Sequence, residues 1–150
     1  MLKPDSVQRG LVGAILQRFL IRGFKLVALK TLTPSIELAE QHYAEHAGKP
    51  FFERITKFIS SSVVVAIVLE GDDVVLTSRK MIGATNPAVA ELGTIRGDFG
   101  LVGGKNCIHG SDSVESAQRE ISLWFAASEI YDPVDHHESW VYERFAVPAK

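Results

Sequence analysis

The hydrophobic pattern of the first half of the chain alternates between helical and strand-like segments. Residues 6–22 carry apolar side chains four positions apart, which predicts one amphipathic helix with Ser6 as its N-cap and Gly23 as its left-handed stop. Residues 24–32 and 63–69 are expected to be strands, and the unbroken β-branched run of the second is typical of a strand buried on both faces. The further helices predicted in this half cover residues 36–44 and 51–59.

The second half begins with a segment that has neither helical nor strand periodicity. Residues 83–110 hold more than half of the chain's twelve glycines, which predicts a long loop, and long loops in compact domains are usually functional. Asp112–Glu115 then gives a helix-start signal, and an apolar stripe runs from Val114 to Phe125. Strands interleaved with helices indicate an α+β or α/β fold; a split β-α-β is one solution, and spacing alone does not choose.

Length and composition limit the class of protein. With 150 residues, of which 46% are hydrophobic and 23% charged, the chain fits one domain spanning residues 1–150. A single cysteine, Cys107, excludes an internal disulfide and a cysteine-cluster zinc site, so a reducing, cytoplasmic setting is expected. The longest apolar run, 63–69, is far below the ~20 residues of a membrane helix, so no membrane association is expected.

Charge is unevenly distributed although the formal net charge is only −2. Residues 1–30 carry six basic side chains and one acidic one, whereas 128–143 carries five acidic side chains and no Lys or Arg before residue 144. A basic half attracts phosphate, but this balance makes nucleic acid the weaker choice of partner.

The glycine-rich segment and its borders contain the residues best suited to bind phosphate. Arg79, Arg96 and Lys105 supply cationic donors, and neighbouring glycines allow backbone N–H groups to approach an anion. No Walker-type sequence is present, so a P-loop is excluded.

His109 is the candidate nucleophile, although a lone histidine is more often structural. Glu120 on the following predicted helix could orient its imidazole, which is the arrangement that covalent catalysis needs. His42 and His46 have the helical spacing of a metal pair, but no third ligand is evident and we expect both at the surface. The remaining histidines, His136 and His137, have no setting comparable to that of His109.

Several short motifs occur together and in order along the chain. They are Lys3-Pro4-Asp5, His42-Tyr43, Lys49-Pro50-Phe51-Phe52, Gly83-Ala84-Thr85-Asn86-Pro87, Gly93-Thr94-Ile95-Arg96-Gly97-Asp98-Phe99 and Asn106-x-x-His109-Gly110-Ser111-Asp112-Ser113. With these motifs the chain resembles the nucleoside diphosphate kinases from Lys3 to about Glu143, leaving 144–150 as a C-terminal extension.

The resemblance implies a ferredoxin-like α+β fold, a split β-α-β with an antiparallel sheet covered by helices. It also implies transfer of the γ-phosphate of a nucleoside triphosphate to a nucleoside diphosphate by a ping-pong mechanism. His109 would be phosphorylated, Glu120 would fix its tautomer, and Phe51 would stack on the base. The residues expected around the phosphates and sugar are Lys3, Tyr43, Arg79, Thr85, Arg96 and Asn106. Mg²⁺ would be held mainly by the nucleotide phosphates rather than by a protein metal site, and the chain would form a homo-oligomer, with a hexamer favoured.

Four departures from the family pattern qualify this expectation. Gly103 stands where an apolar residue, often valine, usually meets the base, Lys105 replaces an arginine, and Leu92 replaces a proline. Only Met1 and Leu2 precede Lys3, so the first strand is expected to be truncated, with an open core and a poorly anchored Lys3. A catalytically weak, kinase-like binding or scaffold protein is therefore the alternative.

Overall fold

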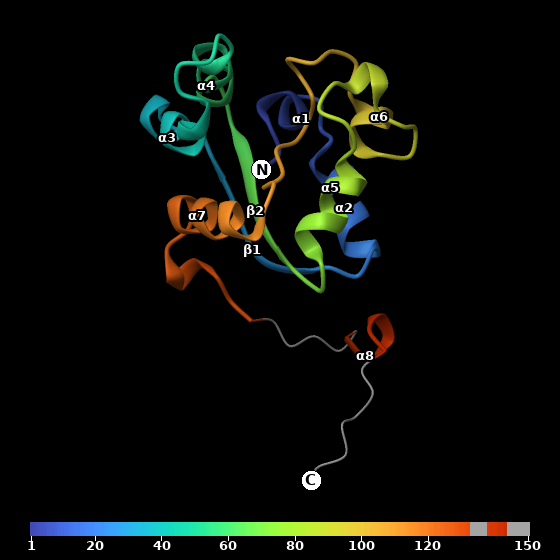
Figure 1. Cartoon of the computed structure of the whole chain (residues 1–150). Helices are drawn as coiled ribbons and strands as arrows, with labels where there is room; N and C mark the ends of the chain where they lie inside the picture. The colour runs from blue at the N-terminus through green and yellow to red at the C-terminus, as the bar shows by residue number, and fades with distance from the viewer. Residues whose placement is uncertain (133–137, 144–150) are drawn as a thin grey trace.

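The computed structural model describes residues 1–132 and 138–143, and its centre is a pair of long antiparallel strands (Figure 1). Strand β1 (Lys25–Leu32) pairs with β2 (Val64–Glu70), with Lys25 opposite Glu70 and Leu32 opposite Val64. The register shifts once, between Leu26 and Ala28. Both strands lie where the hydrophobic pattern predicts them.

Two further segments extend this ladder through single bridges. Leu2 exchanges both backbone hydrogen bonds with Val65, at 2.8 and 3.1 Å, and forms an antiparallel bridge to Ile108 on its other side. The lateral order is therefore β1, β2, Leu2, Ile108, with every neighbouring pair antiparallel. The first two helices connect Leu2 to β1, and β2 lies between these two segments in the sheet. This arrangement is the split β-α-β of a ferredoxin-like α+β fold, as predicted.

Strand β2 is buried on both faces, as its sequence indicates. Val64, Ala66 and Val68 pack into one apolar cluster with Trp124 and Phe125. The alternate residues Val65, Ile67 and Leu69 pack into a second cluster on the opposite face. Side chains that alternate across a pleated strand thus serve two cores, one against each layer of helices.

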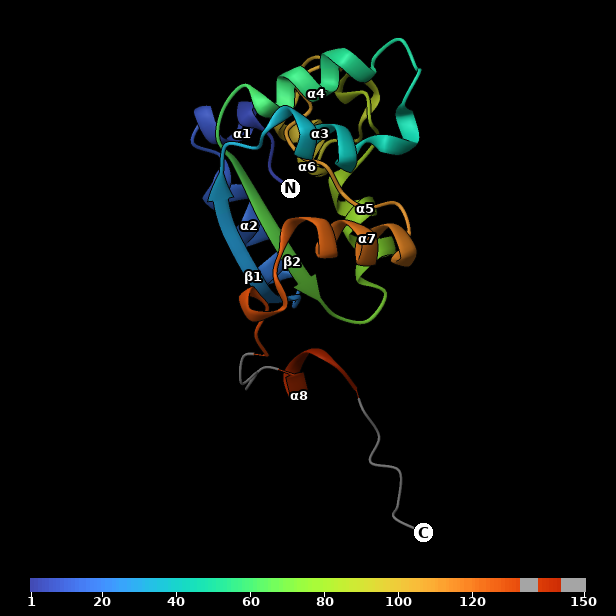
Figure 2. The same ribbon diagram turned by 90° about the vertical axis from the view of Figure 1, so that its left-hand side faces the viewer.

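The helices form a layer on each face of the strands (Figure 2). Helices α3 (Ile36–His42), α4 (Phe52–Ser60) and α7 (Val114–Trp124) lie on one side. The other side holds α1 (Pro4–Gln8), α2 (Val12–Ile21), α5 (Val74–Ile82) and α6 (Ile95–Phe99). The remaining short elements are Ala44–His46, Pro87–Val89, Ala127–Glu129 and α8 (Glu138–Val141). None of the described helices is both long and apolar enough to cross a membrane.

The single helix predicted over 6–22 is wrong, because the chain turns at Gly10, whose φ is +68°. Ser6 is not an N-cap. It lies fully buried inside α1 and donates its hydroxyl to the Cys107 carbonyl at 2.7 Å. Gly23 does adopt the expected left-handed conformation, with φ +104°.

The expected open core and poorly anchored Lys3 are realised only in part. A pocket of about 140 Å³ is lined by Met1, residues 66–69 of β2 and residues 109–111, among others. Lys3, however, is 6% exposed, and its backbone N–H donates to the Cys107 carbonyl at 2.9 Å. The bridges of Leu2 fix the backbone next to Lys3, so the expectation of a poorly anchored Lys3 is wrong.

Candidate active site

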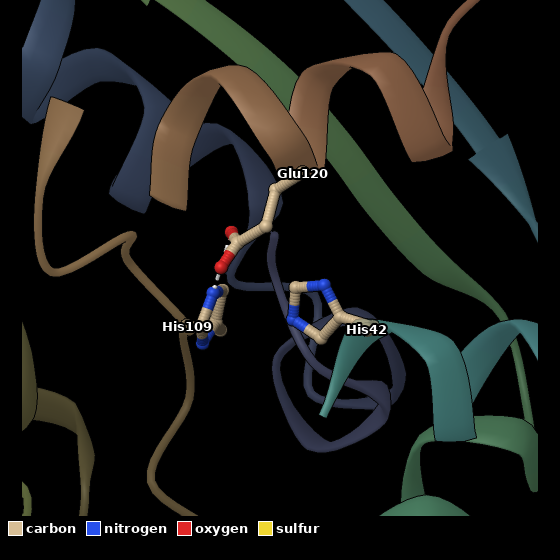
Figure 3. Close-up of side chains that lie close together, drawn as sticks. All are labelled: His42, His109 and Glu120. Atoms are coloured by element: carbon tan, nitrogen blue, oxygen red, sulfur yellow. Dashed lines mark hydrogen bonds and ion pairs between the residues drawn. The ribbon is translucent and has the colours of Figure 1, made fainter. Parts of the chain in front are cut away.

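His109 and Glu120 meet between the end of the sheet and helix α7, as predicted (Figure 3). His109 follows Ile108, the outer bridge residue, and its backbone N–H donates to the Met1 carbonyl at 2.8 Å. Its Nε2 lies 2.8 Å from Oε2 of Glu120, and the Ser111 hydroxyl donates to the same oxygen at 2.8 Å. Glu120 is thus an acceptor with two donors, fixed on a rigid helix.

These contacts determine which nitrogen of His109 can react. A carboxylate beside Nε2 requires the proton on that nitrogen, so Nδ1 keeps its lone pair. Nδ1 makes no hydrogen bond to any residue that the structure describes. Burial lowers the pKa of His109 well below its usual range, and the cations Lys3, Arg96 and Arg79 add to the effect. The imidazole is therefore neutral and nucleophilic at neutral pH.

Arg96 organises the backbone of the glycine-rich segment in front of His109. The side chain is 8% exposed, and its guanidinium donates to the carbonyls of Asn106, Gly83 and Ile108 at 3.2, 3.1 and 2.7 Å. Burial and nearby Arg79 lower the pKa of Arg96, which still leaves a cation at neutral pH.

Lys3 belongs to the same polar network. Its ammonium donates to Oδ1 of Asn106 at 2.8 Å, and the Asn106 amide donates to the Thr85 carbonyl at 2.8 Å. Burial, with Arg96 nearby, lowers the pKa of Lys3 to about 8. Lys3 is thus a buried cation beside the segment that leads to His109, and its lowered pKa is close to neutral pH.

The other predicted site residues lie around this network at different depths. Tyr43 is 4% exposed, its ring is 5.7 Å from that of His109, and its buried hydroxyl has no partner among the described residues. Arg79 is exposed and donates to the Gly110 carbonyl at 3.2 Å. Phe51 is 37% exposed beside His46, 5.3 Å away, so it is not an ordinary core residue.

His42 is not at the surface, and that prediction is wrong. It is 2% exposed, and its ring lies 4.4 Å from the His109 ring at an angle of 78°. The Trp124 indole donates to its Nδ1 at 3.0 Å. In sequence, only the His42-Tyr43 motif pointed to this position. His136 and His137 lie outside the described residues.

The described residues offer no carboxylate cage for a divalent cation among the phosphate-binding side chains. The one cluster of three potential metal ligands in this part of the chain is His42, His109 and Glu120, within 4.8 Å of one another. Glu120 is already engaged by His109 and Ser111.

Sequence relatives match almost end to end. The model of the family described as nucleoside diphosphate kinase matches residues 1–130. Proteins named nucleoside diphosphate kinase are 60% identical in Synechococcus elongatus and 61% in Gloeobacter violaceus, each over 142 residues and 95% of both chains. The one from Staphylococcus epidermidis is 55% identical over 143 residues, or 95% of this chain and 96% of the relative.

Solved structures agree with this fold and this length. A nucleoside diphosphate kinase from Halobacterium salinarum in complex with CDP is 46% identical, with a TM-score of 0.91 over 95% of both chains. A nucleoside diphosphate kinase family protein from Babesia bovis is 42% identical, with a TM-score of 0.91 over 94% of this chain and 95% of that one. Since the family model, the relatives and the fold all agree, the chain belongs to the nucleoside diphosphate kinase family.

Proposed function

We propose that the chain transfers a phosphoryl group between nucleotides by a ping-pong reaction through a phosphohistidine at residue 109. The kinase activity itself, γ-phosphate transfer from a nucleoside triphosphate to a nucleoside diphosphate, follows from family membership. The observation that supports His109 as the carrier is its hydrogen bond to Glu120 at 2.8 Å, which leaves Nδ1 free to attack.

In the first half-reaction, the Nδ1 lone pair of His109 forms a bond to the γ-phosphorus. The bond from that phosphorus to the bridging oxygen breaks, and the nucleoside diphosphate leaves with the electron pair. In the second half-reaction, a terminal oxygen of another diphosphate attacks the phosphorus, the P–N bond breaks, and His109 regains its lone pair. Glu120 keeps the Nε2 proton in place throughout and stabilises the charge that develops on the ring.

The cations of the site position the phosphates and neutralise their charge, which is most of what phosphoryl transfer requires. We assign this task to Lys3, Arg79 and Arg96, with Thr85 and Asn106 as polar contacts to phosphate and sugar. Tyr43 has a buried hydroxyl available as a donor next to His109. The assignments of Lys3, Arg79 and Arg96 are supported by their electrostatic effect on His109. Those of Thr85 and Asn106 are supported by the hydrogen bond that joins these two residues.

Phe51 is our candidate for the base-binding residue. It is half-exposed, and the His46 ring and the Lys49 ammonium lie beside it. Stacking on an aromatic ring has little base selectivity, because every base offers a π-face. We therefore expect broad nucleotide specificity.

Mg²⁺ is the proposed cofactor, bound mainly by oxygens of the nucleotide phosphates. The side chains around the phosphate site are cationic or neutral, which suits a substrate that brings its own cation. When bound, Mg²⁺ supplies charge neutralisation at the phosphate oxygens. We also propose a cytoplasmic location, supported by the single buried thiol, and a homo-oligomer.

The alternative of a catalytically weak scaffold protein is not favoured. Its basis was the short N-terminus together with Gly103. One expected consequence, a poorly anchored Lys3, is contradicted because Lys3 is buried and bonded to Asn106. Relatives that share 55–61% of their residues with the chain are named as kinases.

Steady-state kinetics test the proposed ping-pong mechanism. With a triphosphate donor and a diphosphate acceptor of a different base, a ping-pong enzyme gives parallel double-reciprocal lines. The isolated phosphoenzyme should also transfer its label to an added diphosphate in the absence of donor. Intersecting lines, or a phosphoenzyme that fails to transfer its label, would exclude the covalent route while leaving the kinase activity intact.

A further inference from the structure

We propose that His42 is a positioning residue: it presents a fixed Nε2–H edge to the face of the His109 ring and holds that ring in line with Glu120. The inference rests on the proposed role of His109 and adds to it a third supporting side chain. His42 lies at the end of α3, and His109 follows Ile108, the outer bridge residue. Figure 3 shows an edge of the His42 ring directed at the His109 ring, next to Glu120.

The tautomer of His42 follows from its contact with Trp124. The indole Nε1–H can only donate, and it lies 3.0 Å from Nδ1 of His42. Nδ1 must therefore be the acceptor, and a neutral His42 carries its proton on Nε2. That Nε2 is buried and has no hydrogen-bond partner among the described residues.

The neighbouring ring accounts for this apparently unpaired N–H. The two imidazoles meet edge to face, with centroids 4.4 Å apart and planes at 78°. In Figure 3 the nitrogen of His42 that is turned toward His109 is the one remote from the side-chain attachment, Nε2. An N–H directed at an aromatic face is a weak attraction, but here it also fills the space into which the His109 ring would otherwise rotate.

The same proton argues against a metal site at this cluster. His42, His109 and Glu120 could be taken for a three-ligand site, since their ligand atoms lie within 4.8 Å of one another. A histidine binds a metal through a nitrogen lone pair, and Trp124 forces the proton onto the nitrogen of His42 that faces the cluster. The arrangement suits orientation of a ring rather than coordination of an ion.

A neutral His42 also suits the charge changes at His109. Burial lowers the pKa of His42 to about 2, with His109, the Met1 amino group and Arg119 opposing a positive charge and Glu120 favouring one. His42 therefore stays uncharged while the His109 ring gains positive character during phosphorylation. A cation in that position would repel the phosphorylated ring, whereas a neutral donor does not.

Nitrogen-detected NMR of the isotope-labelled, full-length chain tests the tautomer without any mutation. The proposal predicts that His42 is protonated at Nε2 and that this state persists when His109 becomes phosphorylated. A His42 protonated at Nδ1, or one that exchanges rapidly between the two tautomers, would overturn it. Because wild-type protein is used, a folding defect cannot obscure the result.

Two substitutions of His42 then separate positioning from packing. His42→Phe keeps the shape of the ring but lacks the N–H, whereas His42→Gln loses the ring but keeps an N–H donor. We expect His42→Phe to lower kcat roughly 10- to 100-fold with KM for both nucleotides unchanged, because the His109 ring is misplaced and the nucleotide contacts are intact. His42→Gln should recover part of the loss.

A merely structural role gives a different pattern. In that case His42→Phe would be nearly as active as the wild type, or kcat, KM and melting temperature would change together in both variants, and either outcome would contradict the proposal. Trp124→Phe adds an independent check, since it removes the donor to Nδ1 and should produce mixed His42 tautomers with an intermediate kcat. Trp140→Phe, at an indole that is 88% exposed, is the matched control and should change neither the His42 tautomer nor kcat.

Discussion

Lys3 donates a hydrogen bond to Asn106, three residues before His109, and burial lowers the pKa of both Lys3 and His109. For His109 the consequence is a neutral nucleophile. For Lys3 it is a cation whose charge is lost as the pH rises through about 8, well below the range of an exposed lysine. Phosphate binding should therefore weaken as Lys3 loses its proton, whereas His109 should not change its protonation state around neutral pH.

The pH dependence of kcat/KM measures this difference, since it reports groups in the free enzyme. We expect kcat/KM to stay level from neutral pH down through the ordinary histidine range, and to fall above about pH 8 as Lys3 deprotonates. Lys3→Arg should lower activity at neutral pH but abolish the alkaline fall, because a guanidinium keeps its charge. An alkaline fall that persists unchanged in Lys3→Arg would show that another group titrates there.

Gly103 offers a second test at a single residue. A Cβ built there would have only Oδ1 of Asn86 nearby, at 3.9 Å, so a valine fits without displacing its neighbours. If the base binds between Phe51 and residue 103, as the family pattern implies, Gly103→Val should lower KM for nucleotides roughly two- to tenfold through added apolar contact. Gly104→Val, at a position equally open, is the control. Equal KM values for both variants would place the base elsewhere.

The difference between His42 and His109 illustrates how far sequence reasoning reaches at this scale. The motif around His109 predicts the nucleophile, and the helix start a few residues later predicts the carboxylate that supports it. The buried position of His42 is not predictable in this way, because its partners, Trp124 and His109, lie more than sixty positions away along the chain. Only the packing of α3 against α7 brings them together.

The helices also show that a local sequence pattern does not predict every structural feature. Residues 6–22 were predicted as one helix because Val7, Leu11 and Ile15 are evenly spaced, and all three do pack into the same core cluster. The periodicity reflects this shared core, and it continues across the turn at Gly10. Helix α5 was not predicted, since it begins with two β-branched valines after Asp73, which adopts a left-handed φ of +51°.

Helix α7 was predicted at its correct start, and its cap can be tested directly. Ser113 accepts a hydrogen bond from the Ser116 backbone N–H at 3.0 Å. Ser113→Ala should lower the free energy of unfolding by about 1 kcal/mol. Ser122→Ala, at an exposed position in the same helix, should be nearly neutral. Equal effects in denaturant unfolding of the two variants would contradict the assigned cap.

Across the whole molecule, the pattern of strands and helices indicates only an α+β or α/β fold, and the set of motifs that runs along nearly the entire chain implies the ferredoxin-like one. The order of the sheet segments could not be predicted from this pattern, because it depends on single bridges at Leu2 and Ile108 that have no periodicity of their own. We propose that residues 1–150 form one domain, as the length implies; residues 144–150 lie outside the described part.

We propose that exposed apolar side chains mediate self-association of the chain. Several large apolar side chains are well exposed among the described residues, namely Ile21, Val89, Leu92, Leu101 and Trp140. We expect a hexamer, so light scattering of the purified protein should give about six times the 16.5 kDa of one chain. A monodisperse monomer would contradict the proposed assembly.

The central claim is that His109 carries the phosphoryl group. Purified protein incubated with a γ-labelled triphosphate in the absence of acceptor should gain one acid-labile, base-stable phosphoryl group per chain, located on the peptide that contains His109. His109→Ala should gain none, and a diphosphate should remove the group from the wild-type enzyme. Label that persists in His109→Ala, or full turnover by that variant, would contradict the account.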